Sequence, residues 1–413
     1  MVAGPPITVK FLVMRLTRRK LLKTSCAVAG SFLAGVRRGA AQNGVQPFRI
    51  QFQKSDIDDL HRRIEHTRWP EIAFETGWSA GTNAGVLREL AQYWRQKYDW
   101  FAVQDELNKL PHFRTSINGD GLHFMHFRGN TSGGRFPILL LHGWPGSFVE
   151  FVDGAKLLSG RFDLVVPSLP GFVFSDAPKS PGMHGGKVGE QIHLLMSKLG
   201  YQRYGVQGGD WGAIIGMEMA RRNPSSIVGL HLNFCTEAPQ PPEGVTASDQ
   251  ERAYRARFAA WRATEAAYLD LQGTRPQTLA YGLQDSPVGA LAWILEKFWA
   301  WSEHTDDLWK TFTRDKVLTN VSLYWLTGHI LSAARIYYET RQRQAQPAPQ
   351  GRITVPAGFA RFPAEFAAPP REVLERVFTN LTHYTEQPRG GHFAAMEQPE
   401  LWANDVATFF SKL

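Results

Sequence analysis

The stretch Gly208-Gly209-Asp210-Trp211-Gly212 decides the fold. It follows an apolar run at residues 204–207 and precedes residues 213–221, which read as a helix. A small-x-nucleophile-x-small sequence between a strand and a helix is typical of a nucleophile elbow, the sharp turn that lifts a reactive side chain out of a sheet. The glycines are needed because bulk on either side of the turn would clash. Asp210 is therefore a candidate nucleophile; the alternative is a glycine-rich turn in which Asp210 caps the helix.

Two further glycine-flanked motifs lie where the same architecture needs them. His142-Gly143-Trp144-Pro145-Gly146 ends an apolar run, at the position of the loop that supplies a backbone N–H to an oxyanion hole. We expect Trp144 to supply one such N–H and Trp211 the other. Gly390-Gly391-His392-Phe393 comes late in the chain, which fits the order nucleophile, acid, histidine. A lone histidine is more often structural, so the interpretation of His392 as a catalytic residue depends on the other two motifs.

Short apolar runs around the elbow predict the strands of a buried sheet. The runs are residues 137–141, 163–167, 204–207 and 227–232. The stretches between them, such as residues 188–198, read as helices. This alternation is typical of an α/β fold with a mostly parallel central sheet and helices on both faces. Residues 352–356 and 381–384 predict two later strands, and residues 401–410 predict a closing helix.

The chain divides into five parts by composition. They are a leader (1–41), an N-terminal segment (42–130), a first half of the core (131–237), a helical, aromatic-rich cap (238–350) and a second half of the core (351–413). In the N-terminal segment, Ser55 and Asp58 predict a helix start and Pro70 its end. Residues 83–97 predict a second helix, and Asn118-Gly119 predicts a hairpin turn. We expect this segment to wrap the core and the cap together.

The positive charge of the chain is concentrated in the leader. The formal net charge is +8, and residues 1–41 contain eight basic side chains and no acidic one. The rest of the chain therefore has 38 basic and 38 acidic groups. A balanced body of this kind lacks the clustered Lys and Arg that phosphate binding needs, so we expect no nucleic-acid partner.

The leader resembles a twin-arginine export signal. Arg18-Arg19-Lys20-Leu21-Leu22-Lys23 is followed by thirteen uncharged residues and by the small residues Gly39-Ala40-Ala41. The apolar run is shorter than the about 20 residues that span a bilayer, so we expect no stable membrane span. We expect export to the periplasm or beyond. A basic tail, an uncleaved anchor and a translation start at Met14 remain alternatives.

Composition and missing motifs exclude other classes of protein. Hydrophobic residues make up 43% of the chain, enough for a large core, which excludes disorder as the main state. Of the two cysteines, Cys26 lies in the leader and Cys235 in the body, so a disulfide scaffold is excluded. The sequence contains no GxGxxG, GxxxxGK[ST] or HExxH motif. We expect no metal and no organic cofactor.

Taken together, the motifs resemble the epoxide hydrolases of the α/β-hydrolase superfamily, specifically the microsomal and juvenile-hormone type. The likeness runs from about residue 46 to the C-terminus. Besides the three motifs above, it includes Phe48-Arg49-Ile50, Thr67-Arg68-Trp69-Pro70, Asp285-Ser286-Pro287-Val288-Gly289, Leu295-Glu296-Lys297-Phe298 and Tyr324-Trp325. One departure lies in Leu169-Pro170-Gly171-Phe172-Val173, where the family usually has glycine in the place of Val173.

The resemblance implies a role for each site residue. Asp210 would be the nucleophile, His392 the general base and Glu365 the acid that orients His392. Tyr268 and Tyr337, both in the cap, would hold the epoxide oxygen. The second cap tyrosine could also be Tyr338, the neighbour of Tyr337. These roles imply hydrolysis of a small lipophilic epoxide to a vicinal diol, with water as the second substrate.

The residue types suit this reaction. A carboxylate is ionised at neutral pH and can displace at an sp³ carbon, and a neutral phenol can give a proton to the departing alkoxide. A haloalkane dehalogenase shares the fold and the Asp nucleophile, but needs halide-binding N–H donors in place of the tyrosines. An esterase is disfavoured by Asp210, and a catalytically silent binding protein has no need of the full triad. The sequence leaves a homodimer open.

Overall fold

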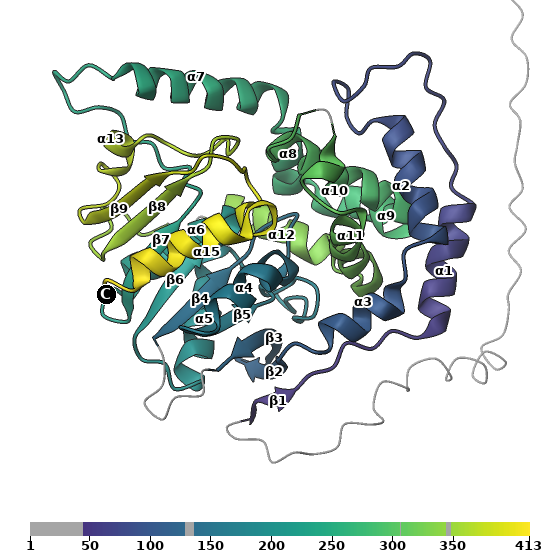
Figure 1. The fold of residues 1–413 in the computed structure, drawn as a ribbon, viewed down its shortest axis with the longest axis horizontal. Coiled ribbons are helices and arrows are strands. Elements are labelled where there is room, and N and C mark those ends of the chain that lie inside the picture. The colour runs from purple at the N-terminus through teal and green to yellow at the C-terminus, as the bar shows by residue number, and fades with distance from the viewer. Residues whose placement is uncertain (1–43, 129–135, 306, 344–347) are drawn as a thin grey trace, which may run out of the picture. The chain divides into compact units, whose positions relative to one another are not determined.

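A nine-stranded mixed sheet organises the part of the chain that the structure describes. The computed structural model describes residues 44–128, 136–305, 307–343 and 348–413 (Figure 1), so the predicted leader lies outside the described residues. The strands lie in the order β1-β2-β3-β5-β4-β6-β7-β8-β9. They are β1 Gln46–Pro47, β2 His112–Ile117, β3 Asp120–Phe127, β4 Pro137–Leu141, β5 Asp163–Pro167, β6 Tyr204–Gly208, β7 Ile227–Leu232, β8 Ala357–Arg361 and β9 Leu381–Glu386.

The six strands from β5 to β9 in this order are parallel, and β1, β2 and β3 add an antiparallel edge. The apolar runs form β4, β5, β6 and β7 as predicted, and the Asn118-Gly119 turn joins β2 to β3. The predicted strand at residues 352–356 is wrong. Residue Ile353 makes only an isolated bridge, and the strand that pairs with β7 and β9 is β8. Pro356 has no N–H to give to a ladder, so pairing starts after it.

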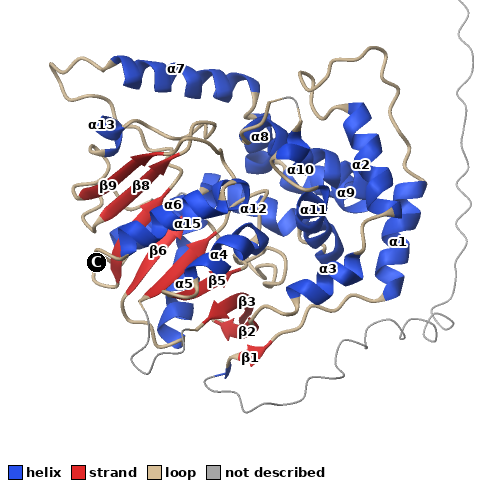
Figure 2. Ribbon diagram, viewed as in Figure 1, coloured by secondary structure: helices blue, strands red, loops and turns tan. Residues whose placement is uncertain are grey.

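Helices cover both faces of the sheet (Figure 2). Those of the core are α4 Val152–Leu158, α5 Gly185–Lys198, α6 Asp210–Arg222, α13 Arg371–Leu374, α14 Ala394–Glu397 and α15 Pro399–Phe410. Neighbouring residues of β6 face opposite layers: a Cβ on Gly205 would lie 2.3 Å from Phe410 of α15, and Val206 lies against Gly216 of α6. This alternation along a strand explains why β6 is buried throughout.

Helices also form most of the cap and part of the N-terminal segment. The cap contains α7 Asp249–Thr264, α8 Ala267–Thr274, α9 Pro276–Asp285, α10 Pro287–Trp301, α11 Arg314–Thr327 and α12 Ile330–Arg341. The N-terminal segment contains α1 Lys54–Glu65, α2 Ala84–Gln96 and α3 Trp100–Leu107. The start and end predicted for α1 are wrong. Gln53 is the N-cap, paired reciprocally with Asp56, and the helix ends five residues before Pro70.

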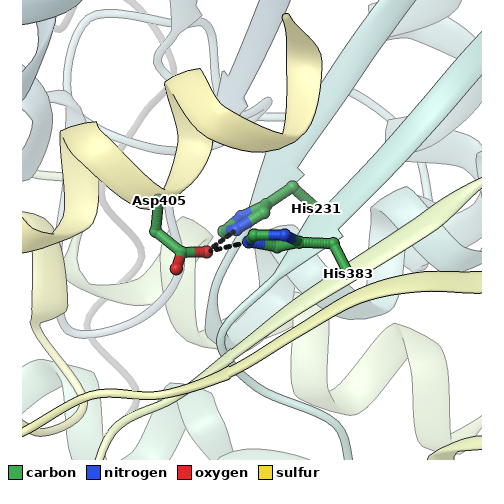
Figure 3. A group of neighbouring side chains, drawn as sticks. All are labelled: His231, His383 and Asp405. Atoms are coloured by element: carbon green, nitrogen blue, oxygen red, sulfur yellow. Dashed lines mark hydrogen bonds and ion pairs between the residues drawn. The ribbon is translucent and has the colours of Figure 1, made fainter. Parts of the chain in front are cut away.

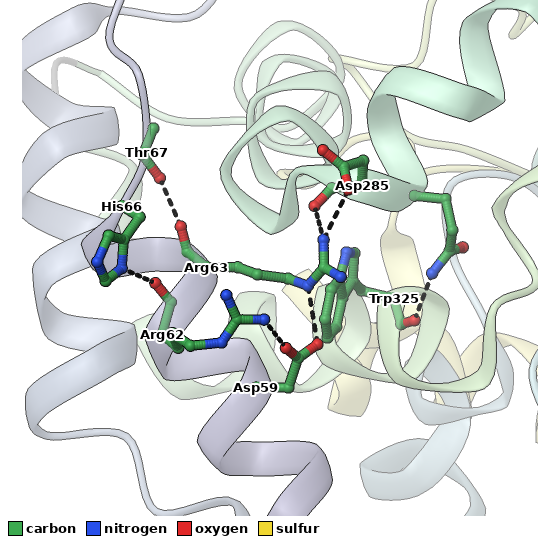
Figure 4. A network of polar contacts seen from close by, with 8 residues as sticks. Asp59, Arg62, Arg63, His66, Thr67, Asp285 and Trp325 are labelled. Carbon is green, nitrogen blue, oxygen red and sulfur yellow. Dashed lines mark hydrogen bonds and ion pairs between the residues drawn. The ribbon is translucent and has the colours of Figure 1, made fainter.

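Polar contacts tie α1 to the cap (Figure 4). The guanidinium of Arg63 donates to the carboxylate of Asp285 at 2.7 Å and to its carbonyl at 2.8 Å. It also donates to Asp59 of its own helix at 2.8 Å and lies 5.9 Å from the centre of the Trp325 ring. In α2, the buried Trp94 donates to Ser322 of α11 at 3.0 Å. The N-terminal segment thus wraps the cap as well as the sheet edge.

Candidate active site

The elbow after β6 holds Asp210 in a strained conformation. Its φ is +49°, a region that non-glycine residues rarely adopt. The flanking glycines make the turn possible, because a Cβ on Gly208 would lie 2.4 Å from the carbonyl carbon of Gly212. A Cβ on Gly212 would lie 1.9 Å from the carbonyl oxygen of Leu141 in β4. The motif therefore presents the carboxylate at the carboxyl end of the sheet, where ligands bind in open α/β folds.

Two backbone N–H groups hold the Asp210 carboxylate. Trp144 donates to Oδ1 at 2.9 Å, and the N–H of Trp211 also donates to this carboxylate. Burial raises the pKa of Asp210, and the charge of His392 and the two N–H donors oppose the rise. The two residues predicted for the oxyanion hole therefore lie at one carboxylate.

The imidazole of His392 lies between two carboxylates. Its Nδ1 is 2.7 Å from Oε2 of Glu365, and its Nε2 is 3.6 Å from Oδ2 of Asp210. Glu365 is fully buried, and its second oxygen accepts the N–H of Ala367 at 2.9 Å. Burial would lower the pKa of His392, but the negative charges of Glu365 and Asp210 outweigh it and raise the pKa to about 9.

Two cap tyrosines lie over this elbow. Tyr268 of α8 stacks on the Trp144 ring at a centroid distance of 5.2 Å, and Tyr337 of α12 lies edge-on to the Trp211 ring at 4.9 Å. The two phenol rings are 6.0 Å apart. Burial, with the charge of Asp210 added, raises the pKa of both phenols well above the usual value, which keeps them protonated. Tyr338, the alternative, is partly exposed and lines a surface pocket.

The chain is similar to known proteins over most of its length. A family model described as the epoxide hydrolase N terminus matches residues 45–151, and one for the alpha/beta hydrolase fold matches residues 137–324. Epoxide hydrolase 1 of Oryctolagus cuniculus is 35% identical over 90% of this chain and 90% of its own length. The chain belongs to the epoxide hydrolase family.

Solved structures agree with this assignment. This epoxide hydrolase matches the juvenile hormone epoxide hydrolase of the silkworm Bombyx mori with a TM-score of 0.81 and 31% identity, over 89% of this chain and 94% of that one. It matches the Aspergillus niger epoxide hydrolase with a TM-score of 0.80 and 31% identity, over 89% and 96%. The predicted α/β-hydrolase fold is confirmed.

Two carboxyl groups near the triad were missed by sequence reasoning. Glu150, in the 3-10 turn η2 (Phe148–Phe151), lines one cavity with Asp210 and His392, and burial raises the pKa of Glu150 to about 8. Glu397 accepts the N–H of Phe393 at 2.9 Å and so supports the loop that contains His392. Glu150 lies eight residues after His142 in the sequence and outside the glycine-rich motif that begins there. Its proximity to this motif is therefore the only sequence signal that could have found it.

The loop that departs from the family pattern is strained in this epoxide hydrolase. Val173 is buried and has a φ of +48°. A β-branched residue in this region is an outlier, whereas glycine adopts such a φ without strain.

A second histidine–carboxylate cluster lies apart from the triad, between β7, β9 and α15 (Figure 3). Oδ1 of Asp405 lies 2.8 Å from Nε2 of His231 and 2.9 Å from Nε2 of His383. One possible metal-binding atom from each of the three side chains lies within 4.8 Å of the other two, which is close enough for all three to bind one metal ion. However, both imidazoles point their Nε2 at the same carboxylate oxygen at hydrogen-bond distance, so the three side chains already form a hydrogen-bonded structural cluster, in which only the Nδ1 of His231 is buried without a partner among the described residues.

Among the described residues, no helix combines the length and the apolar character that crossing a bilayer requires.

Proposed function

We propose that this epoxide hydrolase opens lipophilic epoxides to vicinal diols through a covalent ester on Asp210. The observation that carries the proposal is the convergence on one carboxylate of two N–H donors, an imidazole oriented by Glu365, and two phenols from the cap. Each group suits one step of a two-step displacement.

In the first step the Asp210 carboxylate attacks one ring carbon. A carbon–oxygen bond to Asp210 forms, and the ring carbon–oxygen bond breaks. The departing alkoxide takes a proton from Tyr268 or Tyr337, which burial keeps in the protonated form. Tyr337→Phe should therefore lower the rate of ester formation by about 10²-fold or more, whereas Tyr338→Phe should leave it close to wild type.

In the second step water attacks the carbonyl carbon of the ester. His392 takes the proton of the water, and the N–H groups of Trp144 and Trp211 stabilise the oxyanion, each by about 2.7–4 kcal/mol. Before water attacks, the tyrosinate formed in the first step regains its proton from the His392 imidazolium, which leaves the imidazole neutral to act as the base. Collapse of the tetrahedral intermediate breaks the ester bond, the leaving diol oxygen takes the remaining proton of the added water, and one oxygen of the water stays on Asp210.

Single turnover in ¹⁸O water tests the route. Label is expected in the Asp210 carboxylate, and label found only in the diol would mean that water attacks the epoxide directly. Asp210→Asn should abolish diol formation, and His392→Gln should accumulate the covalent adduct, visible by mass spectrometry of the intact protein.

We propose lipophilic epoxides, including aromatic ones, as the substrate class, and detoxification or aromatic hydrocarbon catabolism as the context. The support is an apolar cavity in the cap beside Trp144. Turnover of a panel of alkyl and aryl epoxides would rank these classes.

We also propose export by the twin-arginine route, which rests on residues 18–23 and the small residues that follow the apolar run. Expression of the full chain with Arg18→Lys and Arg19→Lys should trap the enzyme inside the cell. Unchanged activity in the periplasm would contradict this proposal.

A further inference from the structure

A buried lysine lies against one of the two cap tyrosines. Lys297 of α10 is 2% exposed, although lysine side chains usually keep their charge in water. Its Nζ lies over the ring of Tyr268, 4.9 Å from the centroid, and 5.5 Å from the centroid of the Trp301 ring. Both distances are within the about 6 Å over which an aromatic face attracts a cation. Lys297 belongs to the motif at residues 295–298, which has no role in the proposed mechanism.

Two oxygens hold the ammonium group in this position. Nζ donates to the carboxylate of Glu296 at 2.7 Å and, more weakly, to the backbone carbonyl of Glu265 at 3.5 Å. Glu265 is the C-cap of α7, and α8 with Tyr268 begins two residues later. Because the Glu296 side chain is 25% exposed, water screens its charge more than that of the buried ammonium. The positive charge therefore acts mainly on the rings beside it.

The proposed first step puts a negative charge on a buried phenol. Burial first, and then the charges of Asp210 and Glu365, raise the pKa of Tyr268. The charge of Asp210 disappears as the ester forms, but burial and Glu365 remain. A cation over the ring attracts a phenolate more strongly than a phenol, because the phenolate charge is partly delocalised into the ring. Such an interaction, stronger in the transition state than before it, accelerates the step.

The two cap tyrosines differ in this respect. Among the described residues, no lysine or arginine lies over the ring of Tyr337. The charge of Arg262 also lowers the pKa of Tyr268, but this guanidinium binds Asp270 at 2.9 Å and its side chain is 44% exposed, so solvent screens it. Lys297 is therefore a buried cation that is specific to Tyr268.

We propose that Lys297 is a positioning residue that acts through Tyr268: its ammonium stabilises the phenolate that forms when Tyr268 gives its proton to the epoxide oxygen. The inference rests on the proposed function and deepens it, because it makes Tyr268 the acid and Tyr337 a hydrogen-bond donor to the same oxygen. The proton moves from the Tyr268 hydroxyl to the epoxide oxygen as the ring carbon–oxygen bond breaks. It is replaced from the His392 imidazolium before water attacks, and Lys297 keeps its own proton throughout.

The rate of ester formation in a trapped enzyme tests this inference. In His392→Gln the ester accumulates, so rapid quenching with styrene oxide and mass spectrometry of the intact protein measure its formation alone. Adding Lys297→Met, which keeps the length of the side chain and removes its charge, should slow formation by about tenfold. Lys310→Met, at an exposed site of the cap, should leave the rate unchanged.

A further variant separates the charge from the hydrogen bond to Glu265. Lys297→Gln can still donate a hydrogen bond but carries no charge, so it should be as slow as Lys297→Met. Recovery of the rate in Lys297→Gln would overturn the inference. With His392 intact, hydrolysis of the ester formed in a single turnover should be no slower in Lys297→Met than in wild type, and an equal loss in both steps would contradict the inference too.

Two backgrounds show through which phenol Lys297 acts. In Tyr268→Phe, the addition of Lys297→Met should change the rate of ester formation by less than about twofold, whereas in Tyr337→Phe it should still cost about tenfold.

A rate of ester formation that Lys297→Met leaves unchanged would overturn the inference, and so would a tenfold loss that persists in Tyr268→Phe. In either case the adduct itself would leave the proposed function standing. Absence of any adduct from His392→Gln with Lys297 intact would instead overturn the proposed function.

Discussion

His392 takes opposite protonation states in the two halves of the proposed cycle. With Asp210 ionised, the pKa of the imidazole is about 9, so it is a cation at neutral pH. Once Asp210 becomes an ester, that negative charge is gone and the pKa must fall, which lets the neutral imidazole act as base. The charge of the nucleophile thus controls when the base becomes available.

This coupling predicts that Asp210→Asn lowers the pKa of His392. The substitution removes one of the two nearest charges that raise it and keeps Glu365 in place. NMR titration of the His392 imidazole measures the change, with Asp249→Asn, at a highly exposed site on α7, as control. An unchanged pKa would mean that Asp210 does not control the base.

The strained Val173 gives a second prediction at the scale of one residue. Val173→Gly removes the strain of a positive φ, which stabilises the fold by about 1–3 kcal/mol. The same substitution removes a buried valine side chain, which destabilises the fold by about 1.5–3 kcal/mol. The two effects nearly cancel, so the free energy of unfolding should change by about 1 kcal/mol or less. Val166→Gly in β5, which is buried without a positive φ, should cost several times more in urea unfolding. Equal losses of unfolding free energy in Val173→Gly and Val166→Gly would contradict backbone strain at Val173.

At the scale of elements, prediction succeeded where a motif defines its own boundary. Asn83 caps α2 within one residue of the expected start, and the apolar runs became strands. It failed at α1 and at β8, where capping and pairing partners decide between neighbouring registers. Ser55 could have capped α1 as well as Gln53 does, and only the reciprocal pair of Gln53 with Asp56 selects the start.

The contact between α1 and the cap predicts a measurable coupling. Arg63→Met removes a bond to Asp285 and a bond to Asp59, so it should lower the free energy of unfolding by about 1 kcal/mol. Arg62→Met on the same helix should have little effect, because the Arg62 side chain is more exposed than that of Arg63 and, among the described residues, its guanidinium pairs with Asp59 alone. Equal effects of the two variants in thermal unfolding would mean that the contact with the cap contributes nothing.

At the scale of the whole molecule, the cluster of His231, His383 and Asp405 joins two strands to the last helix. Burial would raise the pKa of Asp405, but hydrogen bonds from the two imidazoles outweigh it and hold the pKa well below the usual value. A lowered carboxyl pKa contributes stability that is present above about pH 4 and is lost as the pH falls toward the folded-state value.

Asp405→Asn should therefore lower the free energy of unfolding by about 2–3 kcal/mol at neutral pH, because the hydroxyl of Thr385 and the amide of Gln387 also donate to the carboxylate. The difference from wild type should shrink as the pH falls below about 4. Urea unfolding across this range measures it. A difference that does not depend on pH would show that the charge of Asp405 is not what stabilises the cluster.

The sequence by itself determined the elbow, the chain order of the site motifs and the parallel core, because these follow from local sterics and from hydrophobic pattern. The roles of Glu365, Tyr268 and Tyr337 came only from resemblance, because nothing local distinguishes them from ordinary buried residues. Tertiary structure alone decided that Tyr337 rather than Tyr338 meets Tyr268, and that Glu150 lines one cavity with Asp210 and His392. The physical reason is that these groups converge from the ends of separate strands and from a cap about a hundred residues away in sequence, and only packing brings them within a few ångströms.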